Sequence, residues 1–179
     1  MDAWVLMSGG VDSTACAQFF IERGDTVRGI FVDYGQAART PEYRAVTRIS
    51  QYLGIQLFDL KLVSPNQFGS GEIIGRNAFL VFAALMTKSP GEGVISLGVH
   101  AGTSYYDCGD KFITDISRIV DSYSAGAVAL FCPFLAEDKP TVHRYATKMG
   151  LPIELTYSCE RGETPPCRHC LSCRDRNAL

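Results

Sequence analysis

Short, mostly apolar runs alternate along the chain with longer segments in which apolar residues recur every three or four positions. The short runs have the length and character of strands that are buried on both faces. They lie at residues 3–7, 27–32, 55–60, 94–99 and 127–132. Segments with helical spacing follow them, at residues 13–23, 41–53, 76–88, 111–123 and 140–149. The pattern therefore predicts five strands that alternate with five helices.

Glycine and proline residues mark several boundaries of these elements. Pro41 suits the first turn of a helix, and Gly54 and Gly150 stand where the preceding helices should stop. Residues 64–75 are rich in Ser, Pro, Asn and Gly, which predicts a loop. The helix predicted at 76–88 carries apolar residues on nearly every side, so we expect it to be buried.

Alternating strands and helices define the predicted fold class. They form an α/β structure in which a parallel sheet is covered by helices on both faces. Right-handed crossovers make it a doubly wound, Rossmann-like sandwich of five strands. Ligands of such sheets bind beyond the carboxyl ends of the strands. The segments that follow strands should therefore share one ligand-binding rim; they are residues 8–13, 33–36, 75–77 and 98–108.

A glycine-rich loop follows the first strand, where residues 8–13 read Ser-Gly-Gly-Val-Asp-Ser. Glycines let the backbone approach an anion closely, and the following helix adds free N–H groups and the positive end of its dipole. The loop lacks the lysine of a Walker A motif and the spacing of a dinucleotide-binding fingerprint. We expect Ser8, Gly9, Gly10 and Ser13 to hold phosphate. Asp12 could bind Mg²⁺ or could simply cap the helix.

Four cysteines crowd the last part of the chain, at Cys159, Cys167, Cys170 and Cys173. Two Cys-x-x-Cys steps and a fourth thiol can complete a tetrahedral zinc shell. With four protein ligands the zinc would be structural, and it would supply much of the folding free energy of this short tail. Substitution of one sulfur by His169, a redox-active cysteine pair and an iron–sulfur cluster are the alternatives.

Composition narrows the possible environment and partners. The formal net charge of −2 argues against a broad nucleic-acid or anionic-membrane surface. The longest apolar run, residues 78–86, is far shorter than the roughly 20 residues that span a bilayer. The amino-terminal residues do not resemble a signal peptide. We therefore expect a cytoplasmic protein without a disulfide framework, although it contains seven cysteines.

Both motifs together carry a resemblance to a known family. Residues 8–13 resemble the pyrophosphate loop of the N-type ATP pyrophosphatases. With the cysteine tail, the chain is similar to the 7-cyano-7-deazaguanine synthases of that group. The other matching stretches, which extend the resemblance over nearly the whole chain, are residues 33–36, 75–78, 98–99, 106–108, 112–113, 139, 156–159 and 176.

The resemblance implies an activity and its cofactors. ATP would adenylate the carboxylate of 7-carboxy-7-deazaguanine, with Mg²⁺ present and pyrophosphate released. Ammonia would then form an amide, and a second activation would give the nitrile. Residues 1–155 would be the ATP pyrophosphatase domain and residues 156–179 a Zn²⁺-binding tail packed on it. A homodimer is also implied.

The same resemblance implies roles for particular residues. Asp12, Ser13 and Lys139 would be catalytic, and Val11 and Asp33 would join the phosphate-loop residues in binding the nucleotide. The substrate would contact Gln36, Arg76, Asn77, Gly98, Tyr106 and Asp107. From the residues alone, Lys139 could be a solvated lysine, Arg76 and Asn77 could cap a helix, and Asp107 could serve only in a turn.

Departures from the family pattern lie at the substrate rim. Ala37 and Ala38 stand where members carry Arg-His, Glu42 is displaced, and the segments 64–75 and 98–106 are short. A trimmed rim could admit an amine larger than ammonia, such as that of a protein, as a second hypothesis. A non-catalytic nucleotide-binding protein and a tRNA-thiolating enzyme are further alternatives. The intact loop argues against the former, and the charge and length argue against the latter.

Overall fold

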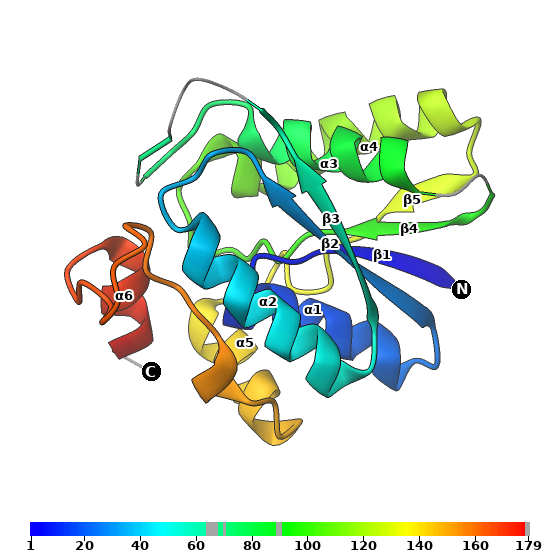
Figure 1. The fold of residues 1–179 in the computed structure, drawn as a ribbon. Coiled ribbons are helices and arrows are strands. Elements are labelled where there is room, and N and C mark those ends of the chain that lie inside the picture. The colour runs from blue at the N-terminus through cyan, green and yellow to red at the C-terminus, as the bar shows by residue number, and fades with distance from the viewer. Residues whose placement is uncertain (64–67, 70, 89–90, 178–179) are drawn as a thin grey trace.

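The structure is a computed structural model that describes residues 1–63, 68–69, 71–88 and 91–177. A parallel sheet in the order β3-β2-β1-β4-β5 forms its centre (Figure 1). The strands are β1 (Asp2–Leu6), β2 (Thr26–Asp33), β3 (Gln56–Lys61), β4 (Gly93–Ser96) and β5 (Val128–Leu130). All five predicted strands and the parallel sheet are confirmed.

Helices cover both faces of the sheet (Figure 1). One face packs against α1 (Val11–Glu22), α2 (Arg39–Leu53) and α5 (Lys139–Lys148), and the other against α3 (Arg76–Thr87) and α4 (Asp110–Ser124). Strand β1 serves both layers because its side chains alternate: Val5 joins the first core and Trp4 the second. The Rossmann-like sandwich is confirmed, and Gly54 ends α2 in the left-handed conformation.

The order of the strands places a topological switch between β1 and β4. The chain runs from β1 outward through β2 to β3, then crosses back to β4 on the other side of β1. Crevices at such switch points are where doubly wound sheets bind ligands. The loop after β1 and the segment after β4 therefore face each other at the carboxyl end of the sheet.

One expectation about burial is wrong. Helix α3 was expected to be buried throughout, but only Asn77, Val81 and Ala84 are buried. Phe79 is 39% exposed and Met86 86% exposed. Helix α3 packs against one face of the sheet with its inner side. Its outer side faces away from the sheet, and nothing in the described part of the chain covers it. The loop expected at 64–75 lies partly outside the described residues.

The cysteine tail contains a helix that was not predicted, α6 (Leu171–Asn177), seen in red in Figure 1. Ser172 and Arg176 of this helix line a small cavity together with Ser8 and Gly10 of the phosphate loop. The Tyr157 N–H donates to the Gly9 carbonyl at 2.9 Å. Gly162 lies so close to the Ala37 carbonyl that a Cβ atom there would stand 2.3 Å from its oxygen. The tail thus contacts the phosphate loop at Gly9 and the residue that follows the rim segment 33–36, Ala37. None of the described helices is long and apolar enough to cross a membrane.

Candidate active site

A cavity of about 290 Å³ opens at the carboxyl ends of β1, β2 and β4. It is lined by segments that the sequence places after different strands. Of the expected site residues it receives Ser8, Asp12, Ser13, Gln36, Arg76, Asn77, Gly98 and Lys139. The predicted common rim is therefore present, and it is concave and lined by both polar and apolar side chains.

The phosphate loop is held by hydrogen bonds between its own residues. Ser13 Oγ donates to the Gly10 carbonyl at 3.1 Å and accepts from the Ser8 N–H at 3.2 Å. Gly9 has a φ of +79°, and a Cβ atom there would lie 2.8 Å from the Glu42 carbonyl oxygen. Only glycine is therefore tolerated without strain at position 9. The loop packs tightly against α2.

Helix α1 begins without a side-chain cap. Its N-cap residue is Gly10, and Asp12 lies inside the first turn. The capping alternative for Asp12 is therefore not what the structure adopts. The amino end of α1 keeps N–H groups without intrahelical partners beside the cavity, which is the arrangement that suits an anion.

The Asp12 carboxylate is instead paired across the cavity. The Lys139 ammonium, at the start of α5, lies 2.8 Å from Asp12 Oδ2. Asp12 Oδ1 is buried and has no hydrogen-bond partner among the described residues. A buried carboxylate oxygen without a donor is the kind of ligand that a Mg²⁺ ion uses, so Asp12 fits the expected role.

Gly98 brings β4 and the phosphate loop into contact. A Cβ atom at this position would lie 2.7 Å from the Ser13 backbone nitrogen and 2.9 Å from the Asp12 carbonyl carbon. Such distances leave no room for a side chain. Gly98 therefore allows the backbones of two neighbouring strand ends to meet at the switch point.

Six expected site residues do not line this cavity: Gly9, Gly10, Val11, Asp33, Tyr106 and Asp107. Tyr106 is 58% exposed, and Tyr105 lines the cavity instead. Asp107 is buried, and its Oδ2 accepts the backbone N–H of Asn77 at 3.2 Å in the first turn of α3. Asp33 accepts the N–H of Gly35 in a turn. Of the phosphate loop, Gly10 and Val11 line a smaller neighbouring cavity of about 130 Å³.

Glu42 and His100 also line the cavity, although neither was among the expected site residues. Burial raises the pKa of Glu42, although its hydrogen bond from Gln36, at 3.1 Å, acts in the opposite direction. Burial lowers the pKa of His100, although the nearby Asp12 carboxylate opposes that shift. His100 follows β4 within a predicted rim segment. The position of His100 after a predicted strand is the signal by which the sequence could have identified it as a site residue.

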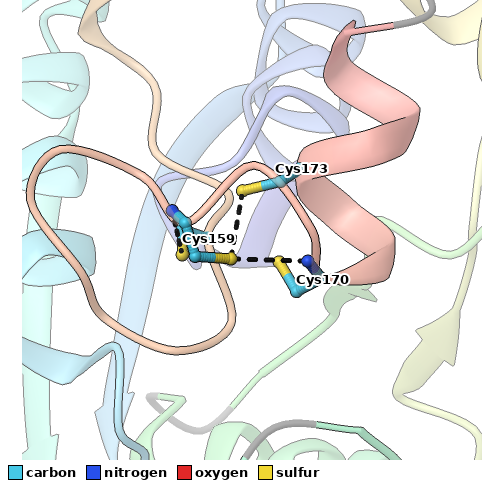
Figure 2. Close-up of side chains that lie close together, drawn as sticks. Cys159, Cys170 and Cys173 are labelled. Carbon is cyan, nitrogen blue, oxygen red and sulfur yellow. Dashed lines mark hydrogen bonds between the residues drawn. The ribbon is translucent and has the colours of Figure 1, made fainter.

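The four tail cysteines converge on one point. Their sulfur atoms all lie within 4.8 Å of one another, and the Cys167 and Cys173 sulfurs are 3.9 Å apart. Figure 2 shows the side chains of Cys159, Cys170 and Cys173 turned toward one another. Sulfurs around a single zinc ion, at about 2.3 Å from it, stand roughly 3.8 Å apart. The cluster therefore fits one tetrahedral ion.

The surroundings of the cluster shift the pKa values of two of its thiols in opposite directions. Burial raises the pKa of the Cys159 thiol, but backbone N–H groups outweigh this effect and lower that pKa to about 6. Burial and the neighbouring cysteines raise the pKa of Cys173 to about 12. Several thiolates this close repel one another, and a bound divalent cation removes that repulsion.

Other tail side chains are engaged away from the sulfurs. His169 Nε2 lies 3.0 Å from an Arg161 guanidinium nitrogen, and its Nδ1 lies 2.7 Å from the Cys167 carbonyl oxygen. Both ring nitrogens thus have partners, which leaves the four cysteines as the candidate ligand set for a metal ion. Arg176 binds the backbone carbonyls of Ile153 and Thr156 and joins the tail to the sheet domain.

Comparisons with known proteins agree with this geometry. The fold resembles a U34-tRNA thiolase, NcsA, from Methanococcus maripaludis, described with its [4Fe-4S] cluster, at 18% identity and a TM-score of 0.60 over 98% of this chain and 63% of that one. A predicted subunit of tRNA methyltransferase from Methanocaldococcus jannaschii matches with 14% identity and a TM-score of 0.56, over 82% of this chain and 74% of that one. At these identities the likeness shows the fold alone.

The phosphate loop, together with a family match, identifies a PP-loop ATP pyrophosphatase. The model of the family described as queuosine biosynthesis protein QueC matches residues 2–77 and 73–178, and the chain belongs to that family. A 7-cyano-7-deazaguanine synthase from Synechococcus sp. (strain CC9605) is 29% identical, over 98% of this chain and 91% of the relative. One from Persephonella marina (strain DSM 14350 / EX-H1) is also 29% identical, over 96% of this chain and 88% of the relative. The chain is therefore an ATP-dependent enzyme of this family.

Proposed function

We propose that the enzyme adenylates the carboxylate of 7-carboxy-7-deazaguanine and transfers the activated acyl group to ammonia. The observation that carries this proposal is the single cavity shared by the phosphate loop, the Asp12–Lys139 pair and the residues Arg76 and Asn77. A nucleotide and the substrate carboxylate could therefore meet there. The curated relatives are 7-cyano-7-deazaguanine synthases, which agrees with this reaction.

The reaction begins with attack of a substrate carboxylate oxygen on the α-phosphorus of ATP. An acyl–AMP bond forms, the bond to the β-phosphate oxygen breaks, and pyrophosphate leaves. Ammonia then displaces AMP and loses one proton to give the amide. A second adenylation, on the amide oxygen, releases a second pyrophosphate. Loss of both N–H protons and departure of AMP then give the nitrile.

The residues of the cavity have distinct tasks in this proposal. The loop N–H groups and the hydroxyls of Ser8 and Ser13 bind the leaving pyrophosphate, where negative charge develops. Lys139 adds a cation at the same place. Asp12 would hold Mg²⁺, which neutralises phosphate charge when bound. Arg76 and Asn77, at the amino end of α3, contact the deazapurine carboxylate or the nucleotide.

The cysteine tail has a structural task in this proposal. The proposed ligands of a structural Zn²⁺ are Cys159, Cys167, Cys170 and Cys173. Four thiolates at these separations complete a tetrahedral shell and leave no open coordination position for a reaction. Elemental analysis of purified protein should find about one zinc per chain. Several irons per chain, with the visible absorption of a cluster, would contradict this assignment.

Product analysis tests the reaction. The protein is incubated with ATP, Mg²⁺, ammonium and 7-carboxy-7-deazaguanine, and products are identified by mass spectrometry. AMP, pyrophosphate and the nitrile are expected. Adenylate formation without amide or nitrile, together with transfer to an added peptide amine, would show that the acceptor is not ammonia. The adenylation itself would be contradicted if the unmodified protein released no more pyrophosphate than a Lys139→Met control.

A further inference from the structure

His100 lies directly beyond β4 at the topological switch, in the cavity that also contains Asp12 and Lys139. Its side chain is 9% exposed. A polar ring with so little exposure needs hydrogen-bond partners on both nitrogens, because an unsatisfied buried polar group is costly. The partners of the two nitrogens therefore indicate what the ring is placed to do.

The Nδ1 atom has a partner within its own turn. The Gly102 N–H donates to His100 Nδ1 at 3.0 Å. A ring nitrogen that accepts a hydrogen bond carries no proton, so the neutral ring has its proton on Nε2. Gly102 makes this contact possible, since a Cβ atom there would lie 3.0 Å from both Cε1 and Nδ1 of the ring.

The Nε2 atom has no such partner. Asp12 Oδ2 is 3.9 Å away, which is beyond hydrogen-bond length, and that oxygen already accepts from Lys139 at 2.8 Å. Within residues 1–63, 68–69, 71–88 and 91–177, no acceptor lies within hydrogen-bond distance of Nε2. The ring is thus oriented by its turn and directs an unused N–H donor into the cavity.

We propose that His100 binds a phosphate oxygen of the nucleotide, and then of the departing pyrophosphate, through its Nε2–H. The inference rests on the proposed function for the nucleotide but concerns a residue with no assigned role. The donor lies beside the Lys139 ammonium and the first turn of α1, where an anion is favoured. It adds a directional hydrogen bond to the charge that Lys139 supplies.

Matched substitutions separate phosphate binding by Nε2 of His100 from the hydrogen bond that its Nδ1 accepts from Gly102. The amide nitrogen of Gln reaches about as far as Nε2, whereas the side chain of Asn reaches only to the Nδ1 position. His100→Asn therefore keeps an acceptor for the Gly102 N–H and removes the donor. His100→Gln keeps the donor. Gly102→Ala keeps the histidine but displaces its ring.

Pyrophosphate binding, measured by calorimetry with Mg²⁺ in excess, is the first readout. A hydrogen bond to a charged group contributes about 1.5–3 kcal/mol, so His100→Asn and Gly102→Ala should weaken binding roughly tenfold or more. His100→Gln should stay within about threefold of the unmodified protein. Equal affinities of the Asn and Gln variants would overturn the inference.

Nitrogen-15 NMR of the unmodified protein with labelled histidine is the second readout, and it does not depend on a variant that folds. The free protein should show the Nε2–H tautomer of His100, and Mg²⁺–pyrophosphate should shift that resonance. A resonance that does not move while pyrophosphate binds, or the absence of pyrophosphate binding, would overturn the inference. If the shift occurs but no deazapurine product forms, the proposed reaction fails and the role of His100 stands.

Discussion

The Lys139 ammonium lies 2.8 Å from the Asp12 carboxylate, although 127 positions separate the two residues in the chain. Lys139 is the first residue of α5, and Asp12 is in the first turn of α1. Both side chains are 23% exposed, so the pair is partly shielded from water. Two helix amino ends thus meet at one side of the cavity, with a cation and a carboxylate between them.

Substitution of Lys139 by Met should affect the reaction far more than the fold. Loss of a group that stabilises developing charge typically costs 10²–10³-fold in rate, and we expect a decrease of that order in ATP–pyrophosphate exchange. The free energy of unfolding should change by about 1 kcal/mol or less, since partly exposed ion pairs contribute little. Lys111→Ala removes an exposed pair with Asp115 and is the control. Equal exchange rates in the two variants would contradict the role of Lys139.

Much of the fold could be predicted because its signals are local. Each strand is a short apolar run, and each helix has its own spacing and its own stop, such as Gly54. The phosphate loop and the four cysteines are also contiguous patterns with one dominant chemical use. The strand-end rule then places separate segments at one rim, whereas Lys139 was assigned to the same site as Asp12 through the family resemblance.

The remaining features depend on which side chains face each other in three dimensions. The exposed side of α3 carries the same apolar residues as a buried helix, so composition could not separate the two cases. Tyr105 and Tyr106 are adjacent and chemically alike, and only the short helical turn at 106–108 decides which one faces the cavity. The role of His100 depends on a hydrogen bond from Gly102, which no spacing rule specifies.

Gly98→Ala should distort the phosphate loop. The added methyl group would lie 2.7 Å from the Ser13 backbone nitrogen, so one backbone must move. Overpacking of this kind costs typically 1–3 kcal/mol, which should lower the melting temperature by roughly 2–10 °C in a chain of this size. Pyrophosphate affinity should fall as well. Gly69→Ala is the control, because its Cβ would have no neighbour within 4 Å. Similar melting temperatures for both variants would contradict the close approach.

Glu42→Gln should stabilise the protein increasingly as the pH rises. Burial raises the folded-state pKa of Glu42, so above the unfolded pKa of about 4.3 the folded state binds more protons than the unfolded state. The free energy of unfolding of the unmodified protein therefore contains a term that falls with rising pH, until Glu42 is ionised in both states. Glutamine removes that term. Urea unfolding of both proteins from pH 4 to pH 8 measures the difference, and a gap that narrows with rising pH would contradict this account.

Removal of the Zn²⁺ that we propose for the cysteine tail should release the tail from the sheet domain. The segment is too short to bury a core of its own, so its folding free energy depends on the ion. After exhaustive chelation, limited proteolysis should cut within residues 157–170, while the sheet domain resists digestion. Pyrophosphate affinity should fall, because the Tyr157 N–H supports Gly9 of the phosphate loop. Full protease resistance of the metal-free protein would show that the ion does not hold the tail.

Arg176→Ala should loosen the tail while the metal stays bound. The guanidinium donates to the carbonyls of Ile153 and Thr156 and to the hydroxyls of Thr156 and Ser158, at 2.8–3.1 Å. These bonds fix the segment that carries Tyr157 against the phosphate loop. Loss of several of them should weaken pyrophosphate binding several-fold and speed proteolysis, at an unchanged zinc content. Arg174→Ala, on the exposed side of the same helix, is the matched control. An unaltered pyrophosphate affinity in Arg176→Ala would show that the loop keeps its shape without the support of the tail.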